Sequence, residues 1–420
     1  MNQSNDGAEA LYGLPKEILF CTRCVISNQR PNSAVEFKHT RRTQKETIAI
    51  DSDGVCDACR VAESKDSTDW KARDEELREL CDRFRRTDGH FDCLVPGSGG
   101  KDSFFQAHVL KHEYGMHPLT VTWAPHMYTE WGRRNHQRWI DAGFDNYLVT
   151  PNSRIHRLLT RLAVDNLFHP FQPFMLGQKI LGPRLARAFG INLVFYGENE
   201  AEYGNPRVDV SQALRDHDYY STDDLDSVYL SGVPVSELLG RYQFEPNDLV
   251  SYLPPAADQV HEANVQVHYL GYYLRWRPQS AYYYAVEHGG FEASPERTPG
   301  TYSKYNSIDD KIDDLHYWTT YIKFGIGRAT YDAAQEIRSG EITREEGVAL
   351  VRRFDGEWPS RFENELMRYL SVTEEFGEVQ REFANPMLSP ESFKEMADQF
   401  RSPHLWKKDN GEWVLRKTVA

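Results

Sequence analysis

The sequence predicts an α/β protein built on a doubly wound parallel sheet, with a small cysteine-containing module before the sheet and a helical region after it. Three observations lead to this prediction. Strand-like apolar runs alternate with amphipathic helical segments from residue 91 onward. A glycine-rich turn directly follows the first of those runs. All six cysteines lie within the first 93 residues, and four of them form two Cys-x-x-Cys pairs.

The glycine-rich turn has the sequence Ser98-Gly99-Gly100-Lys101-Asp102-Ser103. It links the predicted strand 91–96 to the helical run 104–110. Its glycines allow the backbone to approach an anion closely, and the N–H groups at a helix N-terminus stabilise negative charge. The glycine spacing is too short for the P-loop of kinases and GTPases. We therefore predict a phosphate-binding loop; the alternative is a turn that only connects strand and helix.

The elements around this turn follow a β-α-β order. A charged amphipathic helix is expected at 69–86. Strands are expected at 91–96, 118–123, 146–150 and 191–196, and helices at 101–114, 130–142 and 175–189. Such sheets bind ligands at the carboxyl ends of their strands. Two polar segments follow strand ends, namely Ala124-Pro125-His126 and Gly197-Glu198-Asn199-Glu200.

The two cysteine pairs are Cys21-Thr22-Arg23-Cys24 and Cys56-Asp57-Ala58-Cys59. Four thiolates in two such knuckles suit the tetrahedral geometry of a structural Zn²⁺ ion, as in zinc ribbons. Four protein ligands leave no open position for a substrate, so the metal is expected to be structural. Disulfides, a redox pair and idle thiols are the alternatives. Cys81 and Cys93 are expected to be buried apolar residues.

The region beyond residue 256 contains three further patterns. Four aspartates at i, i+4 spacing repel one another unless a cation or a substrate offsets the repulsion, and a solvated helix face is the alternative; they are Asp309, Asp310, Asp313 and Asp314. Lys323 and Arg328 flank a Gly-x-Gly bend, and both are predicted to point at phosphates. The segment 269–284 is rich in Tyr and Trp, and it forms either core packing or a stacking wall for a ring.

Composition limits the classes of partner. The net charge of −14 argues against a nucleic-acid partner, because proteins that grip a nucleic-acid backbone usually present a basic face. No apolar run approaches the roughly 20 residues of a membrane span, and the first residues show no signal-peptide pattern. We expect a cytoplasmic protein without a membrane partner.

The ordered motifs resemble a known family. Ser98 to Ser103 resembles the pyrophosphate loop (PP-loop) of ATP pyrophosphatases, which split ATP between its α- and β-phosphates. Two Cys-x-x-Cys pairs before VPGSGGKDS, the strand end FYGENE, and YIKFGIGRATYDAAQEIRSGEITREEG together resemble the N-acetyl sugar amidotransferases of bacterial surface-polysaccharide and nonulosonic-acid pathways. The resemblance implies an adenine-nucleotide-hydrolase-like fold. It also implies ATP-dependent conversion of a sugar acetamido group to an acetamidino group, with ammonia from a separate glutaminase subunit.

This reaction assigns expected roles to the motif residues. Adenylation of the acetamide oxygen would release pyrophosphate, after which ammonia would displace AMP. The residues expected to bind ATP and its pyrophosphate are Ser98, Gly99, Gly100, Lys101, Asp102, Ser103, Gly197, Lys323 and Arg328. Asp102 is expected to bind Mg²⁺ or to orient the loop. Lys101 is a second catalytic candidate, although its helix position also allows it to point outward. Glu198 or Asn199 is expected to orient the nucleophile or the amide, and adenosine is expected beside His126.

The resulting domain prediction has three parts. They are a zinc-binding four-cysteine module at 1–68, a PP-loop domain at 69–255 with an acidic insertion near 211–255, and a mainly helical domain at 256–420. No cysteine follows Cys93, so no glutaminase nucleophile is visible, and a partner subunit or free ammonium is expected to supply ammonia. Two other functions stay open, a tRNA-modifying thiolase-type pyrophosphatase and a non-catalytic nucleotide-binding protein.

Overall fold

A five-stranded parallel sheet forms the centre of the computed structural model, which describes residues 8–33, 35–203 and 212–420. The strand order is β3-β2-β1-β4-β7. The strands are β1 (Cys93–Pro96), β2 (Pro118–Trp123), β3 (Asn146–Val149), β4 (Leu193–Tyr196) and β7 (Gln266–Tyr269). Leu94 of β1 pairs with Leu119 on one side and with Val194 on the other. The chain therefore reverses its direction of progress at β1, and this reversal creates a ligand-binding crevice in doubly wound sheets.

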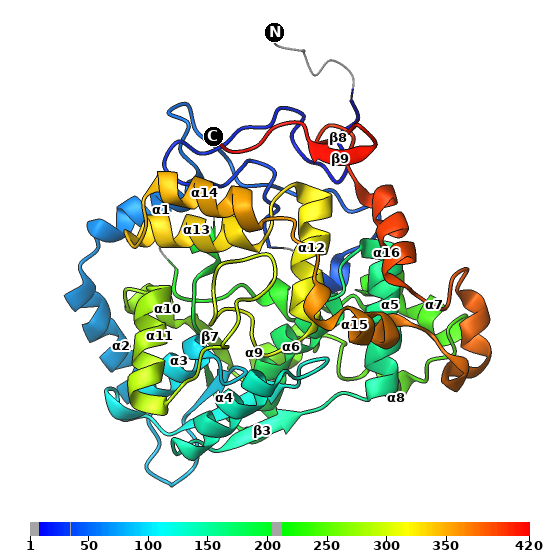
Figure 1. Ribbon diagram of the computed structural model, residues 1–420. Helices are drawn as coiled ribbons and strands as arrows, with labels where there is room; N and C mark the ends of the chain where they lie inside the picture. The colour runs from blue at the N-terminus through cyan, green and yellow to red at the C-terminus, as the bar shows by residue number, and fades with distance from the viewer. Residues whose placement is uncertain (1–7, 34, 204–211) are drawn as a thin grey trace.

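Successive residues of the central strands point to opposite faces of the sheet. Leu94 and Val194 pack with one set of helices, α5 (Ser153–Leu167) and α6 (Gln172–Phe189). Val95 and Phe195 pack on the other face with α2 (Trp70–Phe84), α3 (Lys101–His112), α4 (Glu130–Asp141) and α11 (Pro278–Gly289). Helices thus cover both faces, and the predicted α/β class with a parallel sheet is confirmed (Figure 1).

The sheet differs from the sequence-based expectation in two places. Helix α5 lies in a segment for which no helix was expected, although the Asn152 side chain caps it by accepting from the N–H groups of Arg154 and Ile155. Strand β7 pairs in parallel with β4 over four residues. The sheet therefore extends past residue 255, the boundary expected from composition.

The described part of the predicted acidic insertion, residues 212–255, is folded onto the sheet; residue 211 lies outside the described residues. Its elements are η3 (His217–Tyr219), η4 (Leu225–Ser227), β5 (Tyr229–Leu230), β6 (Val233–Pro234), α7 (Val235–Gly240) and α8 (Pro246–Leu249), followed by α9 (Ala257–Glu262). Tyr220, Leu230 and Tyr252 are buried in the same hydrophobic cluster as α5 and α6. The acidic side chains therefore lie on the outer side of a segment with a packed apolar interior.

The remaining elements are mainly helical. Before the sheet lie η1 (Glu36–Lys38) and α1 (Asp57–Asp66), and η2 (Glu200–Tyr203) follows β4. After β7 come α10 (Leu270–Tyr273), α12 (Ile312–Phe324), α13 (Arg328–Ser339), α14 (Arg344–Phe354), η5 (Ser360–Phe362), α15 (Glu363–Leu370), η6 (Glu374–Glu382), α16 (Pro390–Ala397), η7 (Asp398–Phe400), β8 (Trp406–Asp409) and β9 (Glu412–Leu415). Within the described residues, no helix combines the length and apolar character needed to cross a membrane.

Candidate functional site

The glycine-rich turn forms a closed loop between β1 and α3. The Ser103 hydroxyl donates to the carbonyl oxygen of Gly100 at 3.0 Å and accepts from the N–H of Gly99 at 3.2 Å. Gly99 has a φ of +84°, and a Cβ there would lie 2.7 Å from the backbone of His136. Gly100 is the N-cap of α3 and offers no side chain to the first N–H groups of the helix. Those N–H groups therefore remain available to an anion.

A cavity of about 200 Å³, which we call the loop pocket, opens in front of this turn. Its lining comes from four parts of the chain: the loop (Ser98, Gly100, Lys101, Asp102), α4 (Gly132, Asn135), the strand end (Glu198), and the C-terminal region (Phe291, the segment 305–309, Arg328 and Gln335). Six residues predicted as site residues thus meet in one cavity; they are Ser98, Gly100, Lys101, Asp102, Glu198 and Arg328.

The charges at the loop are arranged around Asp102. The Lys101 side chain is almost fully buried, and its Nζ lies 2.6 Å from an Asp102 carboxylate oxygen, so Lys101 points into the site and not outward. Burial raises the pKa of Glu198 to about 8, Asp102 adds to the rise, and Lys101 opposes it. Gln335 donates to the Glu198 carboxyl group at 3.1 Å. The surroundings of Glu198 therefore favour its neutral form more than water does.

The four aspartates between residues 309 and 314 do not form a solvated helix face. Asp310 is buried and accepts hydrogen bonds from the His126 ring at 2.7 Å and from the Met127 N–H at 3.1 Å. Buried Asp314 pairs with Arg361 at 3.0 Å. Burial raises the pKa of Asp309, which lines the loop pocket, and a hydrogen bond from Ser98 opposes that rise.

Asp313 has no ion pair among the described residues, and burial raises its pKa well above the usual value, with Asp309 and Asp310 adding to the rise. Of the two explanations given for the aspartates, a cation or a substrate beside them therefore remains for Asp309 and Asp313. Arg328 pairs with Asp332 at 2.9 Å and donates to the Tyr317 hydroxyl at 2.9 Å, which holds its guanidinium at the pocket wall.

Other predicted site residues lie elsewhere or have local roles. Lys323, at the C-terminal end of α12, is buried and donates to the Leu167 carbonyl oxygen at 2.7 Å. It lines a different cavity, of about 240 Å³, with Tyr12, His39 and Lys45. Burial and the charge of Lys45 lower the pKa of Lys323 to about 7. The structure thus places Lys323 outside the loop pocket, with its Nζ hydrogen-bonded to Leu167.

Two residues of the strand-end motif support the backbone. The Asn199 side chain accepts from the Ala201 N–H at 2.9 Å and thereby caps η2. Gly197 accepts at its carbonyl oxygen from the Gly271 N–H at 2.8 Å, and a Cβ there would lie 2.7 Å from the Gln106 side chain. Neither residue lines the loop pocket. His126 is likewise held by Asp310 in the interior, and the structure gives it no place on the pocket wall.

Eight residues that line the loop pocket were not predicted as site residues from the sequence: Gly132, Asn135, Phe291, Tyr305, Asn306, Ser307, Ile308 and Gln335. The backbone N–H of Thr129 donates to the Asp309 carbonyl oxygen at 3.1 Å, which brings α4 and the segment 305–309 together. A Cβ on Gly132 would lie 2.6 Å from the Asp309 Cα. These contacts join residues far apart in the chain, and no local motif reveals them.

The aromatic segment 269–284 is largely part of the core. Tyr273 and Trp276 are buried in the cluster that packs on α3, while Tyr283 is exposed. Tyr284 meets Phe105 edge-on, with ring centroids 5.1 Å apart. Core packing therefore describes these residues better than a stacking wall.

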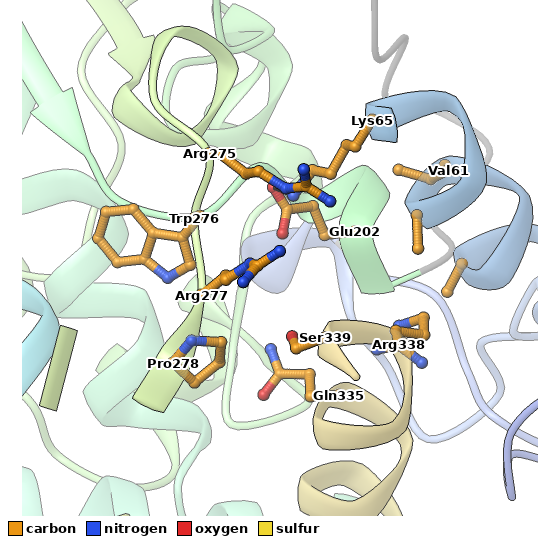
Figure 2. Close-up of a pocket in the computed structure, with 12 residues that line it drawn as sticks. Val61, Lys65, Glu202, Arg275, Trp276, Arg277, Pro278, Gln335, Arg338 and Ser339 are labelled. Atoms are coloured by element: carbon orange, nitrogen blue, oxygen red, sulfur yellow. Dashed lines mark ion pairs between the residues drawn. The ribbon is translucent and has the colours of Figure 1, made fainter. Parts of the chain in front are cut away.

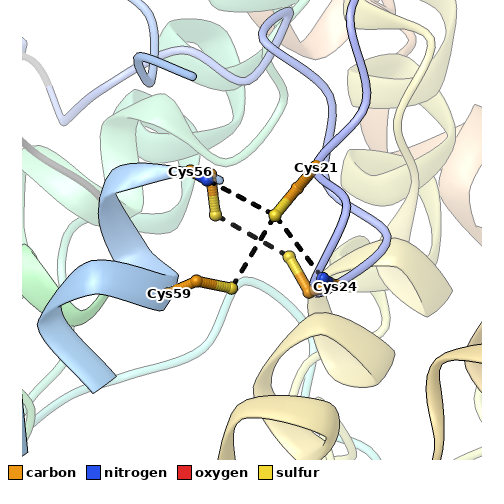
Figure 3. Close-up of side chains that lie close together, drawn as sticks. All are labelled: Cys21, Cys24, Cys56 and Cys59. Atoms are coloured by element: carbon orange, nitrogen blue, oxygen red, sulfur yellow. Dashed lines mark hydrogen bonds between the residues drawn. The ribbon is translucent and has the colours of Figure 1, made fainter. Parts of the chain in front are cut away.

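The four predicted cysteine ligands form a second centre, shown in Figure 3. Their sulfur atoms point toward one another, and all lie within 4.8 Å of each other. The Sγ atoms of Cys21 and Cys59 are 3.8 Å apart, and those of Cys24 and Cys56 are 3.7 Å apart. Tetrahedral Zn–S bonds of about 2.3 Å require sulfur separations of about 3.8 Å.

The surroundings of the cysteines also suit a metal. The N–H groups of Arg23 and Cys56 each donate to the Cys21 sulfur at 3.3 Å, as expected for thiolate ligands. All four cysteines are buried and none forms a disulfide. The cluster is therefore compatible with a structural zinc ion. It is the only group of three or more His, Cys, Asp or Glu ligands in metal-binding proximity that the described residues contain.

Comparison with known families gives one match. Residues 299–419 match the model of a family described as "LPS biosynthesis protein WbpG-like, C-terminal domain", where LPS is lipopolysaccharide. The matched part carries Asp309, Arg328 and Gln335, which line the loop pocket. A comparison with curated proteins finds no match to the chain. This part of the chain is thus similar to the C-terminal domain of a lipopolysaccharide biosynthesis protein.

Proposed function

We propose that this protein is an ATP-dependent amidotransferase that converts an acetamido group of an N-acetylated sugar into an acetamidino group. The observation that carries the proposal is the closed loop at residues 98–103, at the carboxyl end of β1, which opens onto a pocket lined by Asp102 and Glu198. The match of residues 299–419 to a lipopolysaccharide biosynthesis family supports the sugar substrate.

The proposed reaction has two steps. The acetamide oxygen attacks the α-phosphorus of ATP, the bond between the α-phosphorus and the bridging oxygen breaks, and pyrophosphate leaves. Ammonia then adds to the activated carbon, the C–O bond to AMP breaks, and one proton leaves the attacking nitrogen to give the protonated amidine (amidinium). In this proposal, the N–H groups of the loop and the Lys101 ammonium stabilise the negative charge that develops on the departing pyrophosphate. Such electrostatic stabilisation is usually the largest single contribution to catalysis.

The carboxylates of the loop pocket have two proposed roles. Asp102 and Asp309 offer the hard oxygen ligands that Mg²⁺ prefers, and a bound Mg²⁺ would neutralise the phosphates. Glu198 is the group that we assign to accept the proton from the attacking nitrogen in its ionised form, because a pKa of about 8 makes this carboxylate a stronger base than an ordinary one near neutral pH. We propose no role for Lys323 in this chemistry.

Ammonia is proposed to come from a partner glutaminase or from free ammonium. Glutamine hydrolysis by a cysteine nucleophile needs a thiolate near a histidine. Four of the six cysteines belong to the cluster, and the other two are buried in the core. Burial raises the pKa of Cys81 to about 12 and that of Cys93 well above its usual value. None of them is a suitable nucleophile.

The nucleotide products test the proposal. Purified protein with ATP, Mg²⁺, ammonium chloride and a panel of N-acetylated sugars should release AMP and pyrophosphate, and glutamine should not replace ammonium. Asp102→Asn should lower this rate by about 10²–10³-fold, because single contacts to the developing charge have effects of that size. Asp218→Asn, at an exposed position outside the pocket, should leave the rate unchanged. Release of ADP and phosphate would contradict the proposal. Release of AMP and pyrophosphate that depends on added tRNA would favour the thiolase alternative.

A further inference from the structure

A second, smaller cavity shares the lining residue Gln335 with the loop pocket. We call it the basic pocket and define it by Lys65, Glu202, Arg275, Arg277, Gln335 and Arg338. These side chains come from α1, η2, the segment before α11, and α13, and Figure 2 shows them converging on one space. The cavity measures about 50 Å³. That is room for about four water molecules, and a phosphate group has a similar number of non-hydrogen atoms.

The basic pocket carries unpaired positive charge in an otherwise acidic protein. Lys65 pairs with Glu202 at 2.6 Å, and Arg275 pairs with Asp66. Arg277 and Arg338 form no ion pair with any residue that the structure describes. The chain as a whole has a net charge of −14. Two half-buried guanidinium groups without a counter-ion therefore stand out at this place.

The two arginines without an ion pair differ in what else their charges act on. Burial raises the pKa of Glu202, while the charges of Lys65 and Arg338 oppose the rise, so Arg338 faces the pocket. Arg338 also acts electrostatically on Cys24, and its charge is thus shared with the four-cysteine cluster. In Figure 2, Arg277 extends into the space between Glu202 and Gln335. A guanidinium so placed suits a phosphate, which it binds through two parallel hydrogen bonds.

The basic pocket and the loop pocket are neighbours. Gln335 lines both cavities and donates to the Glu198 carboxyl group. Trp276 lines the basic pocket, and a Cβ on Gly197 would lie 2.9 Å from its ring. The positive charge of Lys65 also acts on Glu198, where it offsets part of the rise in pKa that burial causes. One molecule of modest size can therefore place a group in each pocket.

We propose that the basic pocket binds the phosphate group attached to the sugar substrate while the acetamido group of that sugar lies in the loop pocket. The inference rests on the proposed function and adds the substrate class, a sugar that carries a phosphate ester. The phosphate of a nucleoside diphosphate sugar, of a lipid diphosphate sugar and of a sugar phosphate all share this chemistry. The polyphosphate of ATP has its own place at the loop 98–103, so the two anions are bound separately.

Calorimetry on the full-length protein tests the pocket without requiring catalysis. The loop is first saturated with α,β-methylene-ATP and Mg²⁺, and inorganic phosphate, UDP and farnesyl diphosphate are then titrated separately. We expect at least one probe to bind, and Arg277→Gln to weaken its binding by about tenfold. Arg42→Gln removes an exposed arginine that lines neither pocket and should change nothing.

The outcomes separate the two proposals. Tighter binding of UDP than of farnesyl diphosphate identifies a nucleotide-linked sugar, the reverse order a lipid-linked sugar, and binding of phosphate alone a sugar phosphate. Equal affinity in Arg277→Gln and wild-type protein, or no binding of any probe, overturns the inference. If a probe binds through Arg277 but no AMP forms from ATP in the sugar assay, the phosphate site stands and the proposed reaction fails.

Discussion

Glu198 is a buried carboxyl group that would link pH to the nucleotide binding that we propose. Burial and the nearby charge of Asp102 raise its pKa to about 8, and Lys101 only partly offsets them. Below that pH the group is neutral. Above it, a second negative charge appears beside Asp102, where we propose that the phosphates of ATP bind. A bound nucleotide therefore favours the protonated form of Glu198.

The affinity for a non-hydrolysable ATP analogue should consequently fall as pH rises from 7 to 9.5. We expect a loss of about tenfold, which corresponds to roughly 1.4 kcal/mol, and we expect Glu198→Gln to bind with nearly constant affinity over this range. Titration calorimetry with α,β-methylene-ATP and Mg²⁺ at several pH values measures both. Glu287→Gln, at an exposed position, should follow the wild type. A fall of the same size in Glu198→Gln would show that another group is responsible.

Single residues were predictable from sequence where they are contiguous with a recognisable turn. Ser98, Lys101 and Asp102 follow a strand directly, and the backbone of the turn places them in the loop pocket. Lys323 and Asn199 were expected there too, but packing directs Lys323 toward Leu167, and Asn199 bonds within its own turn. The direction of such side chains depends on neighbours that are distant in sequence.

At the scale of elements, the approach of α4 to the segment 305–309 shapes the loop pocket. The Thr129 side chain caps α4 by accepting from the Gly132 N–H at 2.9 Å and also donates to the Ile308 carbonyl oxygen. Gly132 lies so close to Asp309 that a Cβ would lie 2.6 Å from two of its backbone atoms. Backbone cannot yield as a flexible side chain does, so the glycine is required for this contact.

Gly132→Ala should therefore destabilise the protein by about 1–3 kcal/mol, the usual cost of forcing extra volume into a packed contact. It should also weaken binding of α,β-methylene-ATP, because Asp309 moves with its backbone. Urea denaturation and calorimetry measure the two effects. Gly240→Ala is the matched control, since that helical glycine has no atom within 4 Å of its Cβ position; there alanine should be neutral or stabilising. A Gly132→Ala protein as stable as wild type would contradict the argument.

Elements were predictable where their pattern is long or sharply bounded. The expected strand 118–123 coincides with β2, and the expected helix 130–142 differs from α4 by one residue. Helix α5 has a local start signal in the sequence, because the Asn152 side chain caps it. Strand β7 spans only four residues among aromatic helical segments, and its pairing with β4 makes it a strand. That pairing joins segments far apart in the chain, so the local sequence does not predict it.

At the scale of the whole molecule, the cysteine module and the C-terminal region share one core. Cys21, Cys24, Cys56 and Cys59 are buried in a cluster that also contains Ile326, Ala333, Val348 and Trp406. Arg344 of α14 donates to the carbonyl oxygens of Cys24 and Cys21 at 3.2 and 3.4 Å. Figure 1 shows α13 and α14 beside α1 and the N-terminal segment. Composition suggested separate modules, but packing across them could not be read from it.

This shared core makes the proposed zinc ion a support for the loop pocket as well as for the module. We expect about one zinc per chain by elemental analysis. Cys56→Ser should lose the metal, lower the unfolding temperature and weaken binding of α,β-methylene-ATP, because α13 carries both Arg328 and Gln335 on its other side. Structural zinc sites contribute directly to folding free energy. Cys81→Ser changes another buried thiol outside the cluster and should keep the zinc. Native protein without zinc, or a Cys56→Ser variant with unchanged zinc content and unfolding temperature, would show that the four cysteines do not hold a structural metal.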